Sequence, residues 1–196
     1  APLPELTGYR RMPSQDLLRR KASLGSARRA GGNGNDRRGT VTGRTTRRRV
    51  LRIRLPADYD AHPSDRYPLI VQLDPTYVGL QEFAITAGLV SQHAADGRLP
   101  EAVIVGVDYP DPYTRERDYR VPKPPVADFS GAGADRFYRV LRDEILPYVE
   151  TKLRTDASRR TLIGHSNGAV FAWYASFRHA PPDAPLFSAV LASDCG

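Results

Sequence analysis

A serine flanked by glycines constrains the fold of this chain more than any other feature. The segment Gly164–Gly168 reads Gly-His-Ser-Asn-Gly and directly follows the short apolar run Thr161–Ile163. The residues after it have the spacing of a helix. A sharp strand-to-helix turn needs small residues two positions either side of the serine, because larger side chains would collide with the neighbouring strand and helix. The pattern predicts that Ser166 is held clear of a sheet as a nucleophile.

Apolar runs and helical patterns alternate along the rest of the chain. Runs typical of buried strands occupy residues 69–73, 102–107, 161–163 and 188–192, and apolar residues recur at helical spacing within 80–90, 137–149 and 169–179. This alternation predicts an α/β protein with a mostly parallel sheet and helices on both faces. Residues 40–55 alternate as an antiparallel edge would. We expect a kink at Pro147 and a long, proline-rich loop over residues 108–131.

Charge divides the chain unevenly. Residues 1–54 contain 15 Lys and Arg against 3 Asp and Glu, whereas residues 55–196 contain 14 against 19. We predict a flexible basic segment over residues 1–39 and one domain over residues 40–196. The arginine clusters, which include Arg47–Arg49, could attract nucleic acid. No aromatic residues interleave with them, so we favour a solvated tail and the wet face of an edge strand, and we expect no nucleic-acid partner.

Composition excludes several other classes. No apolar run approaches the ~20 residues that a membrane-spanning helix needs. The single cysteine, Cys195, excludes an intrachain disulfide framework and a cysteine-rich zinc site, so we expect no metal. Both the cytoplasm and export remain open as locations, and the oligomeric state is not encoded in any pattern that we recognise.

The turn also predicts where negative charge would be stabilised. The backbone N–H of Asn167 lies at the start of the expected helix, where it would face an oxyanion formed at Ser166. A second donor should come from the loop after the first parallel strand. Pro75 has no N–H, so Thr76 or Tyr77 is the candidate.

From about Val41 onward the chain resembles the enterochelin-esterase-like branch of the α/β-hydrolases, which includes siderophore trilactone esterases. The matching pieces are the serine turn and the runs 51–56, 67–71, 117–122 and 144–150. The resemblance implies a serine carboxylesterase that forms an acyl-enzyme, acts on a small-molecule ester and needs no cofactor. Relatives commonly have glycine where Pro75 stands.

The triad's acid and histidine are harder to place. In this fold they follow the serine, on loops after two later strands. Those strands are not evident, so we expect a C-terminally shortened chain that lacks its base and reacts slowly. Asp194, after the last expected strand, is the candidate acid. Ordinary surface or packing roles are favoured for all four histidines, His62, His93, His165 and His179.

The proline-rich loop offers candidate substrate-binding residues because it should cross the carboxyl ends of the strands. Its aromatic and cationic side chains suit an aromatic, negatively charged ester; they include Tyr113, Arg115, Arg117 and Tyr119. Alternatively, the arginines brace the loop by pairing with Glu116 and Asp118. A catalytically silent protein that keeps the loop for ligand capture is the alternative function.

Overall fold

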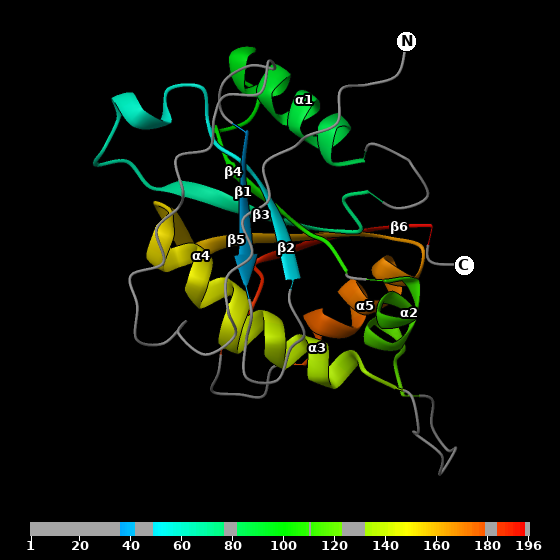
Figure 1. Ribbon diagram of the computed structural model, residues 1–196. Coiled ribbons are helices and arrows are strands. Elements are labelled where there is room, and N and C mark those ends of the chain that lie inside the picture. The colour runs from blue at the N-terminus through cyan, green and yellow to red at the C-terminus, as the bar shows by residue number, and fades with distance from the viewer. Residues whose placement is uncertain are drawn as a thin grey trace.

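One mixed sheet forms the centre of the molecule (Figure 1). The computed structural model describes residues 36–41, 49–76, 82–109, 111–122, 132–178 and 184–194. The predictions for residues 1–35, Tyr77, His179 and Cys195 lie outside these residues. In spatial order the six strands are β1 (Asp36–Val41), β2 (Arg49–Arg54), β4 (Val103–Val107), β3 (Tyr67–Leu73), β5 (Thr155–His165) and β6 (Ala189–Ser193).

Strand directions follow the sequence pattern. β4, β3, β5 and β6 are parallel; β2 lies within the predicted antiparallel segment 40–55, and β1, most of which precedes that segment, adds a second antiparallel strand at the edge. β2 alternates buried and half-buried residues as its period-two pattern requires, whereas β4 is buried throughout because it lies inside the sheet. The mostly parallel sheet is therefore confirmed. β1 begins at Asp36, four residues before the predicted domain boundary, because its register with β2 extends to Arg54.

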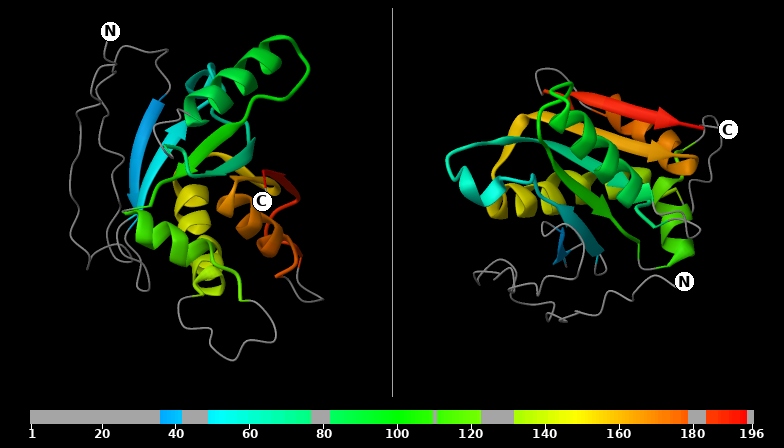
Figure 2. Two further views of the ribbon diagram at one scale, coloured as in Figure 1. Left: turned by 90° about the vertical axis from the view of Figure 1, so that its right-hand side faces the viewer. Right: turned by 90° about the horizontal axis from the view of Figure 1, so that it is seen from above.

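Helices cover both faces, as predicted (Figure 2). α1 (Glu82–Ala95) lies over one face, and α3 (Ala134–Val140), α4 (Leu146–Lys152) and α5 (Asn167–Ser176) lie over the other. The core between the second group and the sheet contains Phe137, Leu141, Leu162 and Phe171. A kink was expected at Pro147; the structure has a π-helical turn, η3 (Leu141–Ile145), before it, and Pro147 lies in the first turn of α4. A short 3₁₀ turn, η1 (Tyr59–Ala61), follows β2.

The expected long loop after β4 contains a helix, α2 (Pro112–Tyr119), so the prediction of continuous loop over residues 108–131 was wrong there. Asp111 caps this helix, because its carboxylate accepts hydrogen bonds from the Thr114 backbone N–H and hydroxyl at 2.8 Å each. Pro112 occupies the first turn, where its missing N–H costs nothing. The helix packs against α3 and α5.

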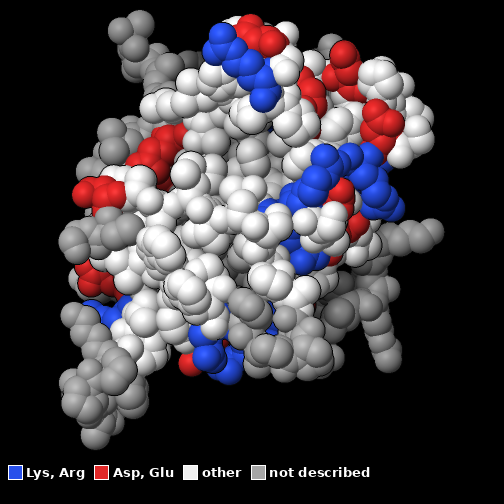
Figure 3. All heavy atoms as spheres, turned by 180° about the vertical axis from the view of Figure 1, so that it is seen from behind, with Lys and Arg blue, Asp and Glu red and all other residues white. Residues whose placement is uncertain are grey.

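Charged side chains lie mainly toward the rim of the face opposite to the view of Figure 1, and its centre is largely uncharged (Figure 3). No helix in the described residues combines the length and the apolar character that crossing a bilayer requires. Arg49 departs from the prediction of a solvated arginine cluster, because it is only 4% exposed. It pairs with Asp118 and lies 4.9 Å from the Phe137 ring centroid, and burial lowers its pKa to about 10.

Candidate active site

Three adjacent strands end in the same unusual way. Asp74, Ser166 and Asp194 directly follow β3, β5 and β6, and their φ angles are +53°, +54° and +54°. They are the non-glycine residues with positive φ in the described part of the chain. A positive φ angle costs free energy in a residue that carries a Cβ. Residues with this conformation cluster at active and binding sites. The carboxyl edge of the sheet is therefore the candidate site.

The serine turn has the predicted strand–turn–helix form. Ser166 has φ +54° and ψ −128°, its N–H donates to the Ser193 carbonyl at 3.0 Å, and its own carbonyl accepts from the Ala169 N–H at 2.8 Å. A Cβ on Gly164 would lie 2.2 Å from the Gly168 carbonyl oxygen. Only glycine fits there, so the first glycine of the motif is explained by direct contact between the end of β5 and the first turn of α5.

The two expected oxyanion donors lie on neighbouring elements. Asn167 is the first residue of α5, and Thr76 follows β3, which is paired with β5. The Thr76 hydroxyl donates to Asp108 Oδ1 at 2.8 Å, and Arg52 Nε donates to Asp108 Oδ2 at the same distance. The loop after β3 is thereby attached to the end of β4 and to β2. Its backbone is held at the same edge as the serine turn.

A buried ionic cluster lies under the turn, and sequence reasoning missed it. Asp74 accepts from Arg115 Nε at 3.0 Å and Nη2 at 2.8 Å, and it is also hydrogen-bonded to the Tyr119 hydroxyl. Burial raises the pKa of Asp74, and the hydrogen bond and charge of Arg115 act in the opposite direction. Burial and the nearby Asp74 charge raise the pKa of Tyr119 well above its ordinary value. Asp74 and Arg115 are 41 residues apart, and no local sequence pattern predicts that they pair.

The candidate substrate-binding residues separate into two groups. Tyr113 is 87% exposed, and Arg117 is half-buried and donates to Asp118 Oδ1 at 2.6 Å. Arg115 and Tyr119 are buried, with their polar groups turned to Asp74. Arg115 and Tyr119 are therefore not surface groups in this structure, whereas Tyr113 and Arg117 remain surface candidates. The alternative pairing of Arg117 with Asp118 is present in the structure.

His165 is flanked by two carboxylates. Its Nε2 is 3.4 Å from Asp194 Oδ2, and its Nδ1 is 3.9 Å from Glu82 Oε1. The Asp194 side chain is 74% exposed, and burial raises the pKa of Glu82, a residue that sequence reasoning did not select. Among the described residues, no histidine forms a hydrogen bond with the Ser166 hydroxyl. The role of Asp194 as the acid stays a prediction.

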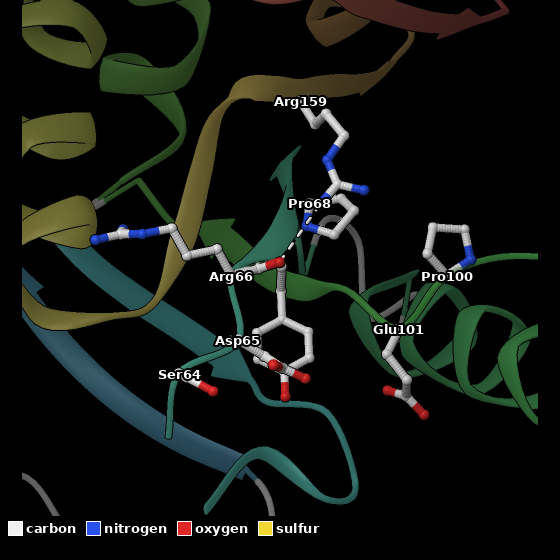
Figure 4. A pocket seen from close by; sticks show the side chains of 8 residues that line it. Ser64, Asp65, Arg66, Pro68, Pro100, Glu101 and Arg159 are labelled. Atoms are coloured by element: carbon white, nitrogen blue, oxygen red, sulfur yellow. Dashed lines mark hydrogen bonds between the residues drawn. The ribbon is translucent and has the colours of Figure 1, made fainter. Parts of the chain in front are cut away.

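A shallow hollow of about 420 Å³ lies at the opposite end of the sheet, near the amino ends of the parallel strands (Figure 4). It lies where β3 begins and before β4, and its lining is Ser64, Asp65, Arg66, Tyr67, Pro68, Pro100, Glu101 and Arg159. The parallel register of β3 and β5 puts this end of the strands away from Ser166. The hollow therefore takes no part in attack by the serine.

Two solved structures and a curated relative resemble this chain. The IroE-like serine hydrolase from Shewanella oneidensis is 29% identical, with a TM-score of 0.64 over 80% of this chain and 49% of its own length. The siderophore hydrolase EstB from Aspergillus nidulans is 21% identical, with a TM-score of 0.65 over 78% of this chain and 54% of its own, and it supports the fold alone. The ferri-bacillibactin esterase BesA of Bacillus subtilis is 28% identical over an alignment of 128 positions.

That alignment covers 56% of this chain and 42% of BesA, so the chain spans about half the length of these relatives. Residues 42–191 match the family described as "Putative esterase". This match extends over most of the chain and includes β2 to β5, the serine turn and the first part of β6. The chain belongs to this esterase family, in its enterochelin-esterase-like branch, and has the α/β-hydrolase type of fold.

Proposed function

We propose that this protein is a carboxylic ester hydrolase in which Ser166 forms an acyl-enzyme. The observation that carries the proposal is the strained backbone of Ser166 between β5 and α5, at the edge where two other strands end in positive φ. Strain of this kind holds the hydroxyl away from the sheet and beside the N-terminus of α5. Membership in the esterase family supports the same chemistry.

In the proposed reaction, Ser166 Oγ bonds to the carbonyl carbon of the ester, and the carbonyl oxygen becomes an oxyanion. The backbone N–H groups of Asn167 and Thr76 donate to that oxygen, and the N-terminal end of α5 adds a favourable field. The bond from carbon to the alcohol oxygen then breaks, and the alcohol leaves with the proton that the serine gave up. Water attacks the acyl-enzyme, releases the acid and restores the hydroxyl.

The substrate class that we propose is a siderophore-type ester. The curated relative is named for a siderophore, ferri-bacillibactin, and the EstB neighbour is titled a siderophore hydrolase. On this chain, exposed Tyr113 offers an aromatic surface, and Arg117 adds positive charge on the same helix. These groups suit the aromatic, metal-chelating ligands of a catecholate siderophore.

A catalytically silent ligand-binding protein is the second candidate. The observation that favours it is the histidine placement, because in the described residues no imidazole forms a hydrogen bond with the Ser166 hydroxyl. A serine without a base reacts slowly, since loss of one triad member costs on the order of 10⁴-fold or more.

Labelling with a fluorophosphonate separates the two candidates. The protein is treated with and without imidazole, which supplies a base from solution, and the modified peptide is identified by mass spectrometry. We expect modification at Ser166, faster with imidazole, and none in Ser166→Ala. Ser64→Ala, which removes an exposed serine at the other edge of the sheet, should leave labelling unchanged. Absence of labelling under both conditions would favour the silent protein.

A further inference from the structure

The Asp74 carboxylate lies close to the first turn of α5, the helix that follows Ser166. A Cβ placed on Gly168 would lie 3.0 Å from Asp74 Oδ2, the same oxygen that accepts from Arg115 Nη2 at 2.8 Å. Gly168 is in the first turn of α5, two residues after Ser166. Asp74 also precedes Thr76 by two residues. One buried carboxylate therefore lies between the two backbone segments that would donate to the oxyanion.

Arg115 is well placed to hold this carboxylate rigidly. It lies on α2, whose start is fixed by the Asp111 cap and which packs against α5. Its guanidinium binds both oxygens of Asp74, and such a planar, two-point contact fixes orientation as well as distance. Tyr119 lies one helical turn further on, and its hydroxyl is hydrogen-bonded to the same carboxylate. The Tyr119 ring centroid is 5.3 Å from the Arg115 guanidinium carbon.

Asp74 also sets the direction of the loop that follows it. Its φ of +53° turns the chain sharply at the end of β3, and the ring of Pro75 fixes the φ angle at the next position. Aspartate tolerates this conformation better than most residues that carry a Cβ. The pairing with Arg115 holds the turned residue from one side, while the bond from Thr76 to Asp108 holds the loop from the other.

We infer that the Asp74–Arg115 pair is a positioning device that holds the loop after β3 in register with the Ser166 turn, so that the Thr76 and Asn167 amides converge on one oxyanion. This inference rests on the proposed function and names residues that act through others, since neither side chain reaches the reacting atoms. A buried ion pair adds little net stability, so its value here lies in the geometry that it imposes.

The chain supplies its own matched control. Arg49 and Arg115 are both buried guanidiniums paired with a buried carboxylate, and both pairs anchor α2. Arg49 reaches α2 from β2 and pairs with Asp118, whereas Arg115 attaches α2 to Asp74 at the end of β3. Arg115→Lys and Arg49→Lys therefore make the same chemical change in two anchors, of which only Arg115 pairs with Asp74.

The test measures three quantities on the full chain for wild type, Arg115→Lys, Arg49→Lys and Asp74→Asn. They are the rate constant of fluorophosphonate labelling in the presence of imidazole, the Kd of phenylboronic acid, which forms a tetrahedral adduct with the serine, and the Tm. We expect Arg115→Lys to lower the labelling rate about 10-fold and Asp74→Asn about 10²-fold, because a small misplacement of reacting groups has effects of this size. Phenylboronic acid should bind more weakly in the same order.

Arg49→Lys should lower the Tm as much as Arg115→Lys but change the labelling rate and the boronate affinity less than about 3-fold. Equal losses of rate in the two lysine variants would overturn the inference and make both pairs structural anchors only. Unchanged rates in Arg115→Lys and Asp74→Asn, with wild type labelled, would overturn it as well while leaving the proposed function intact. A wild type that is not labelled at all, with or without imidazole, overturns the proposed function and the inference with it.

Discussion

The two ends of the sheet differ in the residue types that adopt positive φ angles. At the carboxyl end, three strands are followed by residues with side chains at positive φ, Asp74, Ser166 and Asp194. In the connection from α1 to the amino end of β4, the described residue with positive φ is a glycine, Gly97, at +69°. Glycine adopts this conformation freely, whereas a residue with a Cβ does so at a cost.

Their ionic contacts differ in the same way. Near the serine turn, Asp74 is paired with Arg115 in the interior. At the amino end, Asp156 pairs with Arg159, whose side chain is half-exposed and lines the hollow of Figure 4. Strain and buried charge are thus concentrated at the end that holds the serine. At the amino end of the strands, the ion pair described is partly exposed, as is usual on a protein surface. Mutations at that end therefore serve as controls for mutations near Ser166.

The largest effect is expected for Gly164→Ala. The new Cβ would lie 2.2 Å from the Gly168 carbonyl oxygen, and backbone on both sides prevents relief by a side-chain movement. We expect the free energy of unfolding to fall by about 3 kcal/mol and the serine turn to open, with loss of labelling at Ser166. Denaturant unfolding and fluorophosphonate labelling measure the two effects.

Gly88→Ala is the control for that substitution. Gly88 lies within α1, and a Cβ there meets nothing within 4 Å. Alanine should stabilise this helix by roughly 0.5–1 kcal/mol. If Gly164→Ala were as stable as wild type, the close contact between the end of β5 and α5 would not exist, and the steric account of the motif would fail.

A smaller effect of opposite sign is expected for Ser166→Gly. Glycine relieves the positive φ of the turn, so the variant should unfold with about 1 kcal/mol more free energy than wild type while losing all labelling. Ser166→Ala keeps the Cβ and should lose labelling without that gain. A glycine variant no more stable than the alanine variant would show that Ser166 is not strained. Gly97 also has positive φ, and a Cβ there would meet nothing within 4 Å. Gly97→Ala should therefore lower the free energy of unfolding by a similar amount.

The smallest effect concerns Asp156 at the amino end. Hydrogen bonds from Ser158, followed by Arg159, lower the pKa of Asp156 from 3.8 to about 2. A carboxyl whose pKa is lowered by folding stabilises the protein above its unfolded pKa, and this contribution disappears as the pH falls through the folded pKa. The Tm of Asp156→Asn should therefore lie slightly below that of wild type at pH 6, and the difference should shrink between about pH 4 and pH 2.

Calorimetry across that pH range measures the difference in Tm. A gap that stays constant down to pH 2 would mean that ionisation of Asp156 contributes nothing to folding. Because the side chain is exposed to water and salt, the effect should also weaken at high ionic strength.

Apolar spacing was sufficient to predict the sheet and most helices. The runs at 69–73 and 102–107 correspond to β3 and β4, and the stripe that includes Phe83 and Ala87 corresponds to α1. These elements bury carbon on regular faces, and regular burial leaves a periodic pattern in the sequence. The serine turn was predictable for a related reason, since steric exclusion restricts Gly164 to one residue type.

The remaining parts depend on contacts that leave no local pattern. α2 was missed because its buried side chains include Arg115 and Asp118, whose charges obscure the helical face. Their partners, Asp74 and Arg49, are far away in the sequence. Arg49 looked like part of a solvated cluster for the same reason. The cap at Asp111 followed by Pro112 was the one local signal that could have revealed the helix.

The stacked pair on α5 has a practical consequence. Trp173, the only tryptophan of the chain, lies with its indole nearly parallel to the Phe177 ring, at a centroid distance of 5.9 Å and an interplanar angle of 9°. It is half-exposed, on the helix that Ser166 introduces. When tryptophan is excited selectively over the ten tyrosines, the fluorescence of this protein therefore originates from one indole, and its wavelength and intensity form a label-free signal of events in the helix after Ser166.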